Sequence, residues 1–137
     1  MTDSRKRMAA RWALAAIFLA AGILHVAVPA PFVGIVPGWV PAPRLTVFAT
    51  GICEIAGAAG LMIPPLRRAA GIGLALYALC VWPANVHHMI RDLSSGTGLP
   101  LWYHVPRQFA QPIIMWWALW ASGAIDWPWR TRHRNGD

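Results

Sequence analysis

Charged residues are scarce in this chain. Only 12% of its 137 residues are Asp, Glu, Lys or Arg, whereas 57% are hydrophobic. A soluble domain carries roughly 25% charged residues. The composition therefore argues against a protein that is solvated on all sides, and at this length we expect a single domain.

Cysteine is also nearly absent. The two cysteines, Cys53 and Cys80, lie inside apolar runs, and no CxxC motif occurs. A thioredoxin-like dithiol and a zinc site built on paired cysteines therefore have no support. We expect both thiols to be buried apolar side chains.

Acidic residues are few, and the net charge is +7. The basic residues do not form a nucleic-acid motif, so no nucleic-acid partner is predicted. They gather beside apolar runs, as they do at the cytoplasmic ends of membrane spans. These clusters are Arg5-Lys6-Arg7 with Arg11, Arg67-Arg68, and Arg130 with Arg132 and Arg134.

What the chain has instead is long hydrophobic runs. Four of them have about the 20 residues that cross a bilayer as a helix. The sequence predicts an all-α, transmembrane four-helix bundle with spans at about 11–30, 45–63, 69–90 and 105–125. The first run also resembles a signal peptide, but it is longer than the usual 7–15 apolar residues.

The connections between the runs differ in character. Pro64-Pro65 followed by two arginines predicts a tight turn, and residues 94–98 predict a flexible polar loop. Pro106 is expected in the first turn of the last helix. Residues 31–44 are apolar but contain four prolines, so we expect no continuous helix there. We interpret them as a surface or re-entrant segment between helices 1 and 2.

Lys and Arg are distributed unequally between the two sides of such a bundle. Nine fall on the side shared by residues 1–10 with the adjoining Arg11, the 64–68 turn and the tail 126–137, and three fall on the other side. The positive-inside rule therefore predicts a multi-pass protein of a bacterial inner (cytoplasmic) membrane with both termini in the cytoplasm.

Each apolar run carries polar side chains toward the outer side. With a rise of about 1.5 Å per residue, Glu54 lies about 13 Å below the outer end of its span, and the others lie closer to that side. Because a charge at the centre of a span costs roughly 2.5–3.5 kcal/mol, a shared depth indicates a site. The candidate residues of this ligand-binding or buried polar cluster are His25, Glu54, Asn85, His87, His88, Arg107, Gln108 and Gln111.

Each candidate also has a structural interpretation. Glu54, if buried, needs a partner, and Arg107 and His25 are the candidates at compatible depth. Asn85 can hydrogen-bond a neighbouring helix, and Arg107 can reach lipid headgroups. A metal site is not predicted, because His25 and Glu54 with His87 or His88 show no HxxxH or ExxH spacing. No catalytic nucleophile is predicted either.

The sequence resembles the DoxX-like family in an ordered combination of four features. They are AGILHVAVPAPFVGIVPGWVPAPR (residues 21–44), a Glu in the second run, WPANVHHMI (82–90), and Arg107 with Gln111. The family pattern of His, Glu, Pro-Ala-Asn and Arg-x-x-x-Gln matches His25, Glu54, residues 83–85, and Arg107 with Gln111. Pro112 departs from it, because the family often has its proline between the Arg and the Gln. The resemblance implies a small bacterial inner-membrane bundle loosely linked to thiosulfate–quinone oxidoreduction and redox-stress complexes.

Three functions stay open at this point. The first is a redox-associated subunit, itself not necessarily catalytic, that binds a quinone or another small molecule in the polar cluster. The second is a structural or assembly partner of a membrane redox complex, with the cluster as a buried network. The third is a transporter of a small solute or proton, which the nearly apolar inner halves disfavour. The bilayer is the expected partner, and a homo-oligomer is compatible with all three.

Overall fold

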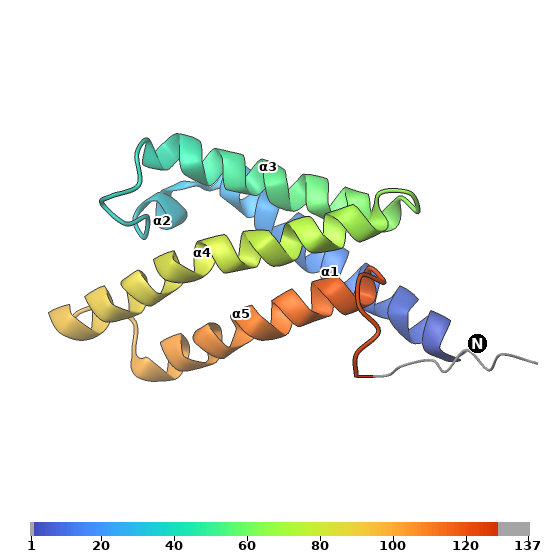
Figure 1. The fold of residues 1–137 in the computed structure, drawn as a ribbon. Helices are drawn as coiled ribbons and strands as arrows, with labels where there is room; N and C mark the ends of the chain where they lie inside the picture. Colours follow the sequence, from blue (N-terminus) through green and yellow to red (C-terminus); the bar gives the residue numbers. More distant parts are fainter. Residues whose placement is uncertain (1, 129–137) are drawn as a thin grey trace, which may run out of the picture.

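The computed structural model describes residues 2–128, and in this range it contains five helices and no strand. They are α1 (Thr2–Ala27), α2 (Ala30–Val33), α3 (Pro43–Met62), α4 (Arg67–Ser95) and α5 (Leu101–Ala121) (Figure 1). The all-α prediction is confirmed. The predicted tail 126–137 falls largely outside the described residues.

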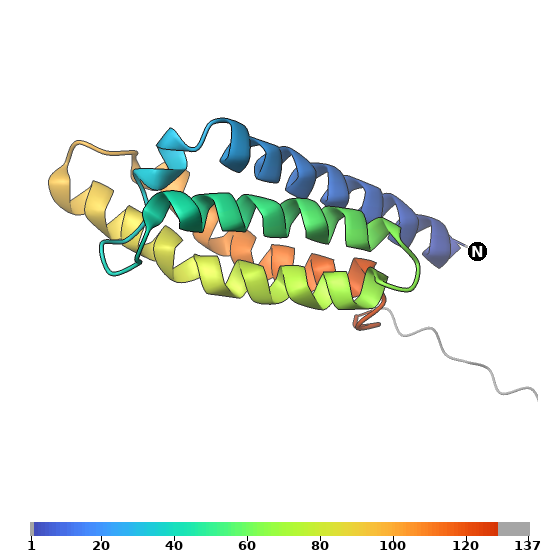
Figure 2. The ribbon, with the colours of Figure 1, turned by 90° about the horizontal axis from the view of Figure 1, so that it is seen from above.

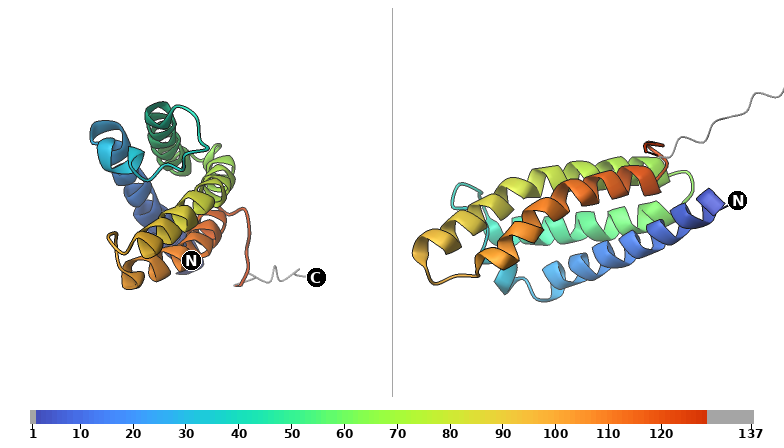
Figure 3. Two further views of the ribbon diagram at one scale, coloured as in Figure 1. Left: turned by 90° about the vertical axis from the view of Figure 1, so that its left-hand side faces the viewer. Right: turned by 90° about the horizontal axis from the view of Figure 1, so that it is seen from below.

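Four long helices run along the molecule in alternating directions. The start of α1, the α3–α4 turn and the end of α5 lie at one end, and α2 and the α4–α5 connection lie at the other (Figures 1 and 2). Helix α1 packs against α3, and α4 packs against α5; further contacts join α3 to α4 and α1 to α5. The end-on view in Figure 3 shows these as two neighbouring pairs.

The apolar core lies mainly in the half of the molecule that holds the termini. Leu14 and Phe18 of α1 meet Leu61 of α3, Leu74 of α4 and Ala118 of α5 there. Leu14, Leu61 and Leu74 are almost completely buried. The polar contacts of this half are mainly side chains bound to backbone carbonyls, such as Arg11 to Ala121 and Trp117 to Ala10. Its buried core holds no carboxylate or imidazole among the described residues.

The outer faces of the helices are apolar as well. Large hydrophobic side chains stand exposed along all four long helices, among them Trp12 and Ile17 of α1, Phe48 and Ile52 of α3, Leu76 and Leu79 of α4, and Phe109 and Ile113 of α5. A water-soluble protein rarely exposes so much contiguous apolar surface. Among the described residues, three helical segments are long and apolar enough to cross a membrane: Arg5–Ala27, Pro43–Met62 and Arg67–Ser95.

Helix α5 is not among those three segments. It has 21 residues, which is long enough for a span, but it carries His104, Arg107, Gln108 and Gln111. These polar side chains lower its hydropathy. The expected fourth span is therefore a helix of suitable length whose apolar sequence is interrupted by polar side chains.

Two predicted helix ends were wrong. Helix α4 continues to Ser95, so residues 94 and 95 belong to a helix, and Gly96 ends it in the left-handed conformation (φ 67°). The last turn is extended because Ser94 and Ser95 donate to the carbonyls of Arg91 and Asp92. Helix α5 begins directly after Pro100, so Pro106 lies inside it rather than in its first turn.

The segment 31–44 is not one continuous helix, as its prolines predict. After the short α2 the chain turns repeatedly, and Ala42 adopts a left-handed conformation (φ 47°) before α3 begins. Arg91 of α4 donates to the carbonyl of Gly34 at 2.8 Å, and Trp39 packs edge-on against His87. The connection between α1 and α3 is thus attached to the far half of α4.

The cysteine prediction was wrong in one respect. Cys53 and Cys80 are free thiols, as expected, but both are exposed on the outer faces of α3 and α4. Small side chains fit an apolar outer surface as well as they fit an apolar core, so the composition around a cysteine could not distinguish the two positions.

Candidate functional site

Two glycines bring α1 and α3 into backbone contact and thereby position the first polar cluster. A Cβ atom on Gly22 would stand 2.7 Å from the Gly51 carbonyl oxygen, and one on Gly51 would stand 2.9 Å from the Gly22 carbonyl oxygen. Residues three apart on a helix share a face. His25 and Glu54 each follow one of these glycines by three positions, so the glycine contact turns them toward each other.

The Glu54 cluster consists of Glu54, His25 and Tyr77, contributed by α3, α1 and α4. Glu54 is only 5% exposed. Its Oε1 atom accepts a hydrogen bond from the Tyr77 hydroxyl at 2.8 Å, and its Oε2 atom lies 2.9 Å from His25 Nδ1. Phe32 of α2 stacks on the His25 ring with a centroid distance of 3.9 Å. The carboxylate is therefore enclosed by groups from three long helices.

The hydrogen-bonding capacity of this cluster is only partly used. His25 Nδ1 donates to the carbonyl oxygen of Ala21 at 2.7 Å. Because both neighbours of Nδ1 are acceptors, this nitrogen must carry a proton, and the Ala21 carbonyl oxygen is the nearer of the two, at 2.7 Å against 2.9 Å to Glu54 Oε2. Apart from this ion-pair contact with His25, the buried Glu54 Oε2 atom has no hydrogen-bond partner in the described range. A buried carboxylate oxygen in this condition can accept one more donor.

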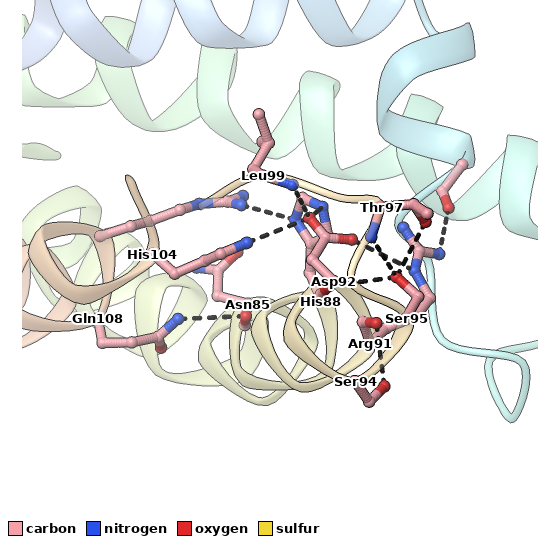
Figure 4. A network of polar contacts seen from close by, with 12 residues as sticks. Asn85, His88, Arg91, Asp92, Ser94, Ser95, Thr97, Leu99, His104 and Gln108 are labelled. Carbon is pink, nitrogen blue, oxygen red and sulfur yellow. Dashed lines mark hydrogen bonds and ion pairs between the residues drawn. The ribbon is translucent and has the colours of Figure 1, made fainter. Parts of the chain in front are cut away.

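The second cluster, the Asp92 cluster, lies at the far end of α4 and α5 (Figure 4). Asp92 Oδ2 lies 2.9 Å from His88 Nε2 and 3.1 Å from His104 Nε2, and it accepts the backbone N–H of Leu99 at 3.0 Å. His104 is fully buried, and His88 and Asp92 are 6% and 8% exposed. One carboxylate oxygen thus accepts two hydrogen bonds and makes a third polar contact, with His88, within a helix pair and its connecting loop.

Arg107 fixes the proton positions in the Asp92 cluster. Its Nη1 atom lies 3.0 Å from His88 Nδ1. A guanidinium can only donate, so Nδ1 must be the acceptor. The His88 proton therefore sits on Nε2 and points at Asp92. Nδ1 of His104 is buried and has no hydrogen-bond partner within residues 2–128.

The other predicted site residues lie around the Asp92 cluster or apart from it. Gln108 donates to the backbone carbonyl of Asn85 at 3.1 Å and accepts from the Trp82 indole at 3.1 Å. Gln111 is buried on α5. His87 points away from both clusters, toward Trp39.

The structure therefore divides the predicted single layer into two clusters. Tyr77 and His88 are eleven positions apart on α4, which corresponds to about 16 Å along the helix. His25 and Glu54 belong to one cluster, and His88 and Arg107 belong to the other. Arg107, expected as a partner of Glu54, is instead bound to His88. Of the two expected partners of Glu54, only His25 contacts it.

Three members of these clusters were not predicted: Tyr77, Asp92 and His104. A spacing signal was available for two of them. Asp92 follows His88 by four residues, and His104 precedes Gln108 by four, which places each pair on one helix face. The signal was missed because the third span was expected to end near residue 90 and the fourth to begin near 105. Tyr77 had no comparable signal. It lies among apolar residues, and because both faces of this helix are apolar there, the sequence does not show which face points into the bundle.

Two surface grooves lie beside the clusters. One, of about 370 Å³, is lined by Trp39, Trp82 and His87 together with Leu79, Pro83, Val86 and Ile90. The other, of about 500 Å³, runs along residues 27–30 and includes Val33, Gly34 and Arg44. The second groove borders α2, the helix whose Phe32 covers His25.

The fold and the two clusters define a class. This is an all-helical protein with three helices long and apolar enough to cross a membrane, and with carboxylates and imidazoles buried between its helices. The chain belongs to the family described as a domain of unknown function (DUF8561), whose model matches residues 14–122. No curated protein and no solved structure matches the chain.

Proposed function

We propose that this chain is a four-span protein of a bacterial inner membrane, DoxX-like in its sequence pattern. In this proposal it binds a quinol or a similar small hydroxyl donor at the Glu54 cluster as a redox-associated subunit. The observation that carries the proposal is the buried Glu54 Oε2 atom, which lies beside His25 without accepting a hydrogen bond from the described residues.

The exposed apolar faces and the alternating helix directions support the membrane part of the proposal. Lipid satisfies no backbone group, so helices with apolar outer faces are the form that a spanning chain takes. The basic residues Arg7, Arg11 and Arg67 lie at the end that holds the start of α1 and the α3–α4 turn, which by the positive-inside rule is the cytoplasmic end.

The chemistry of Glu54 supports the choice of ligand. A quinol hydroxyl can donate to Oε2, while the Tyr77 hydroxyl and the His25 ring hold the carboxylate in place. An ionisable side chain within a membrane span usually marks a functional site. In this proposal the electrons of a bound quinol pass to a partner subunit. This fits the DoxX-like resemblance, whose members are linked to quinone oxidoreduction.

The test is binding of decylubiquinol by the purified chain, followed by quenching of tryptophan fluorescence and by quinone extraction from the preparation. We expect saturable binding that weakens at least about tenfold in Glu54→Gln, the loss expected when one hydrogen bond to a charged group, worth about 1.5–3 kcal/mol, is removed. Tyr77→Phe should weaken binding less, because it disturbs the carboxylate only indirectly.

The matched control is His87→Ala, because His87 lies on α4 outside both clusters. Binding by this variant should equal that of the wild type. Absence of any quinol binding or copurifying quinone in the wild type would refute the proposal. So would equal binding by Glu54→Gln and the wild type, provided that both variants unfold at similar temperatures.

A second function is favoured by the Asp92 cluster, where one carboxylate oxygen already accepts two hydrogen bonds and also contacts His88. Such a saturated network suits an assembly partner whose polar groups only hold helices together. Under this alternative, Glu54→Gln lowers the unfolding temperature in detergent and leaves quinol binding absent in both proteins. The two functions thus differ in whether the wild type binds the ligand.

A further inference from the structure

His88, Asp92 and His104 place three metal-ligating atoms around one point. Each residue offers one ligand atom, and these atoms lie within 4.8 Å of one another. All three side chains are buried. Two imidazoles and one carboxylate form a ligand set that proteins use for zinc and for iron(II).

The two separations measured from the carboxylate oxygen are close to those of a tetrahedral site. Zinc binds imidazole nitrogen and carboxylate oxygen at about 2.0–2.2 Å, which puts neighbouring ligand atoms about 3.3 Å apart. The observed separations from Asp92 Oδ2 are 2.9 Å to His88 Nε2 and 3.1 Å to His104 Nε2. A shift of a few tenths of an ångström in each side chain would open the space for an ion.

We propose that His88, Asp92 and His104 form a binding site for a divalent transition metal of the zinc type. The site is separate from the Glu54 cluster, and it neither depends on nor supports the quinol proposal. It leaves at least one coordination position for water or another ligand, because the chain supplies three ligands and zinc takes four.

The backbone holds Asp92 in position for this role. The Leu99 N–H donates to Oδ2 and orients the carboxylate. Gly98 packs so closely on the Asp92 side chain that any Cβ at residue 98 would overlap it. Asp92 and His88 share a face of α4, being four residues apart, and α5 brings His104 against them. The ligands thus come from the α4–α5 helix pair, and the loop that joins these helices contacts the Asp92 carboxylate through Gly98 and Leu99.

Arg107 competes with the metal. A metal on His88 Nε2 requires the proton of that ring to move to Nδ1, and Nδ1 now accepts from Arg107. An N–H at that position would face a cation. Arg107 must therefore turn away when the metal binds. The centroid of the Tyr103 ring lies 5.8 Å from the guanidinium carbon, so this ring can hold the guanidinium by a cation–π contact.

The ring proton must also change position at His104. Its Nδ1 atom has no hydrogen-bond partner in the part of the chain that the structure describes. Moving a proton to this nitrogen opposes no cation, but it leaves a buried N–H without an acceptor among these residues. His88 is therefore the ligand at which a neighbouring cation, Arg107, opposes the metal.

The experiment uses the full chain purified in detergent and stripped of metal with a chelator. Zn²⁺ is titrated against a fluorescent chelator, and the bound metal is counted by elemental analysis after gel filtration. We expect one Zn²⁺ per chain, and Co²⁺ in its place should give the visible absorption of a four-coordinate ion. His88→Ala and His104→Ala should each weaken binding at least about tenfold.

Two other histidines provide matched controls. His25→Ala and His87→Ala remove an imidazole without touching the site, so their Zn²⁺ affinity should equal that of the wild type. Zn²⁺ should also raise the unfolding temperature of the wild type, because a ligand stabilises the state that binds it. This shift should disappear in His104→Gln, which serves if the alanine variants do not fold.

Arg107→Gln tests the competition. It removes the opposing cation and offers an amide oxygen to an N–H on His88 Nδ1, so we expect Zn²⁺ binding to tighten about tenfold, a change equivalent to about 1.4 kcal/mol. The site is refuted if neither the wild type nor Arg107→Gln binds Zn²⁺ stoichiometrically. It is equally refuted if His88→Ala and His104→Ala bind as well as the His25→Ala control.

Discussion

The two polar clusters hold a buried carboxylate in different ways. Both place a carboxylate among helices with apolar outer faces. Glu54 is held by residues from three long helices, and one of its oxygens accepts no hydrogen bond within residues 2–128. Asp92 is held within one helix pair, and its Oδ2 atom accepts two hydrogen bonds and also lies 2.9 Å from His88 Nε2. Depth along a helix therefore does not by itself define a site, because the two carboxylates accept different numbers of hydrogen bonds, one at Glu54 and two at Asp92.

The largest expected effect concerns the contact that creates the Glu54 cluster. Gly51→Leu would drive a side chain into the backbone of α1, so we expect a loss of at least about 3 kcal/mol of unfolding free energy. The measurement is unfolding of the detergent-solubilised protein, followed by near-UV circular dichroism.

Gly73→Leu is the control for this variant. A Cβ at Gly73 would meet nothing within 4 Å, so the same substitution there should change stability little. Equal losses in the two variants would mean that Gly22 and Gly51 do not set the approach of α1 to α3.

A smaller effect is expected from removing the negative charge of Asp92. Asp92→Asn keeps the shape of the side chain but offers its three partners a weaker acceptor, and one amide N–H faces them. The loss of unfolding free energy should therefore be about 2 kcal/mol.

Glu54→Gln should lower the unfolding free energy by about 1 kcal/mol, because only the Tyr77 hydroxyl donates to that carboxylate. The two variants are compared by denaturant unfolding at one pH. A larger loss in Glu54→Gln would reverse the proposed contrast between the clusters.

Tyr77→Phe removes one hydrogen bond from the Glu54 cluster and leaves its packing intact. We expect a loss of about 1 kcal/mol, the ordinary net contribution of such a bond. Tyr103→Phe is the companion variant, because Tyr103 is partly exposed on α5 and should contribute less. If the two tyrosine variants unfold alike, the Tyr77 hydroxyl does not stabilise the Glu54 carboxylate.

The smallest effect is expected outside both clusters. His87→Ala should change stability by no more than about 0.5 kcal/mol, as is usual for positions away from buried networks. The variant loses only the edge contact with Trp39. A loss as large as that of Asp92→Asn would show that the segment between α1 and α3 depends on this contact.

The sequence predicted the order of the long helices well, because each is a long apolar run ended by proline, glycine or charge. The predicted second span, about 45–63, is close to Pro43–Met62. The ends near residues 95 and 101 were missed because Asp92 and His104 looked too polar for a helix that continues a span. Their mutual pairing, which removes that cost, is visible only in three dimensions.

The partners of Glu54 were harder to predict than its depth. Depth follows from counting residues, but the face on which a side chain lies follows from amphipathic periodicity. Helices that are apolar on both faces carry little of that signal. The sequence therefore indicated that Glu54 needs a partner and included His25 among the candidates. It could not show that Tyr77, rather than Arg107, would be the second.

The compactness of the Asp92 cluster along the chain has a consequence for how the protein is made. His104 follows Asp92 by only 12 residues, whereas Tyr77 follows Glu54 by 23. If the chain enters a bilayer as successive hairpins, α4 and α5 supply the hydrogen-bond partners of their own carboxylate before they meet any other helix. Glu54 has no partner of this kind on its own helix and depends on α1 and then on α4. Burial of Glu54 would then have to wait for α4, whereas the α4–α5 hairpin would satisfy Asp92 by itself.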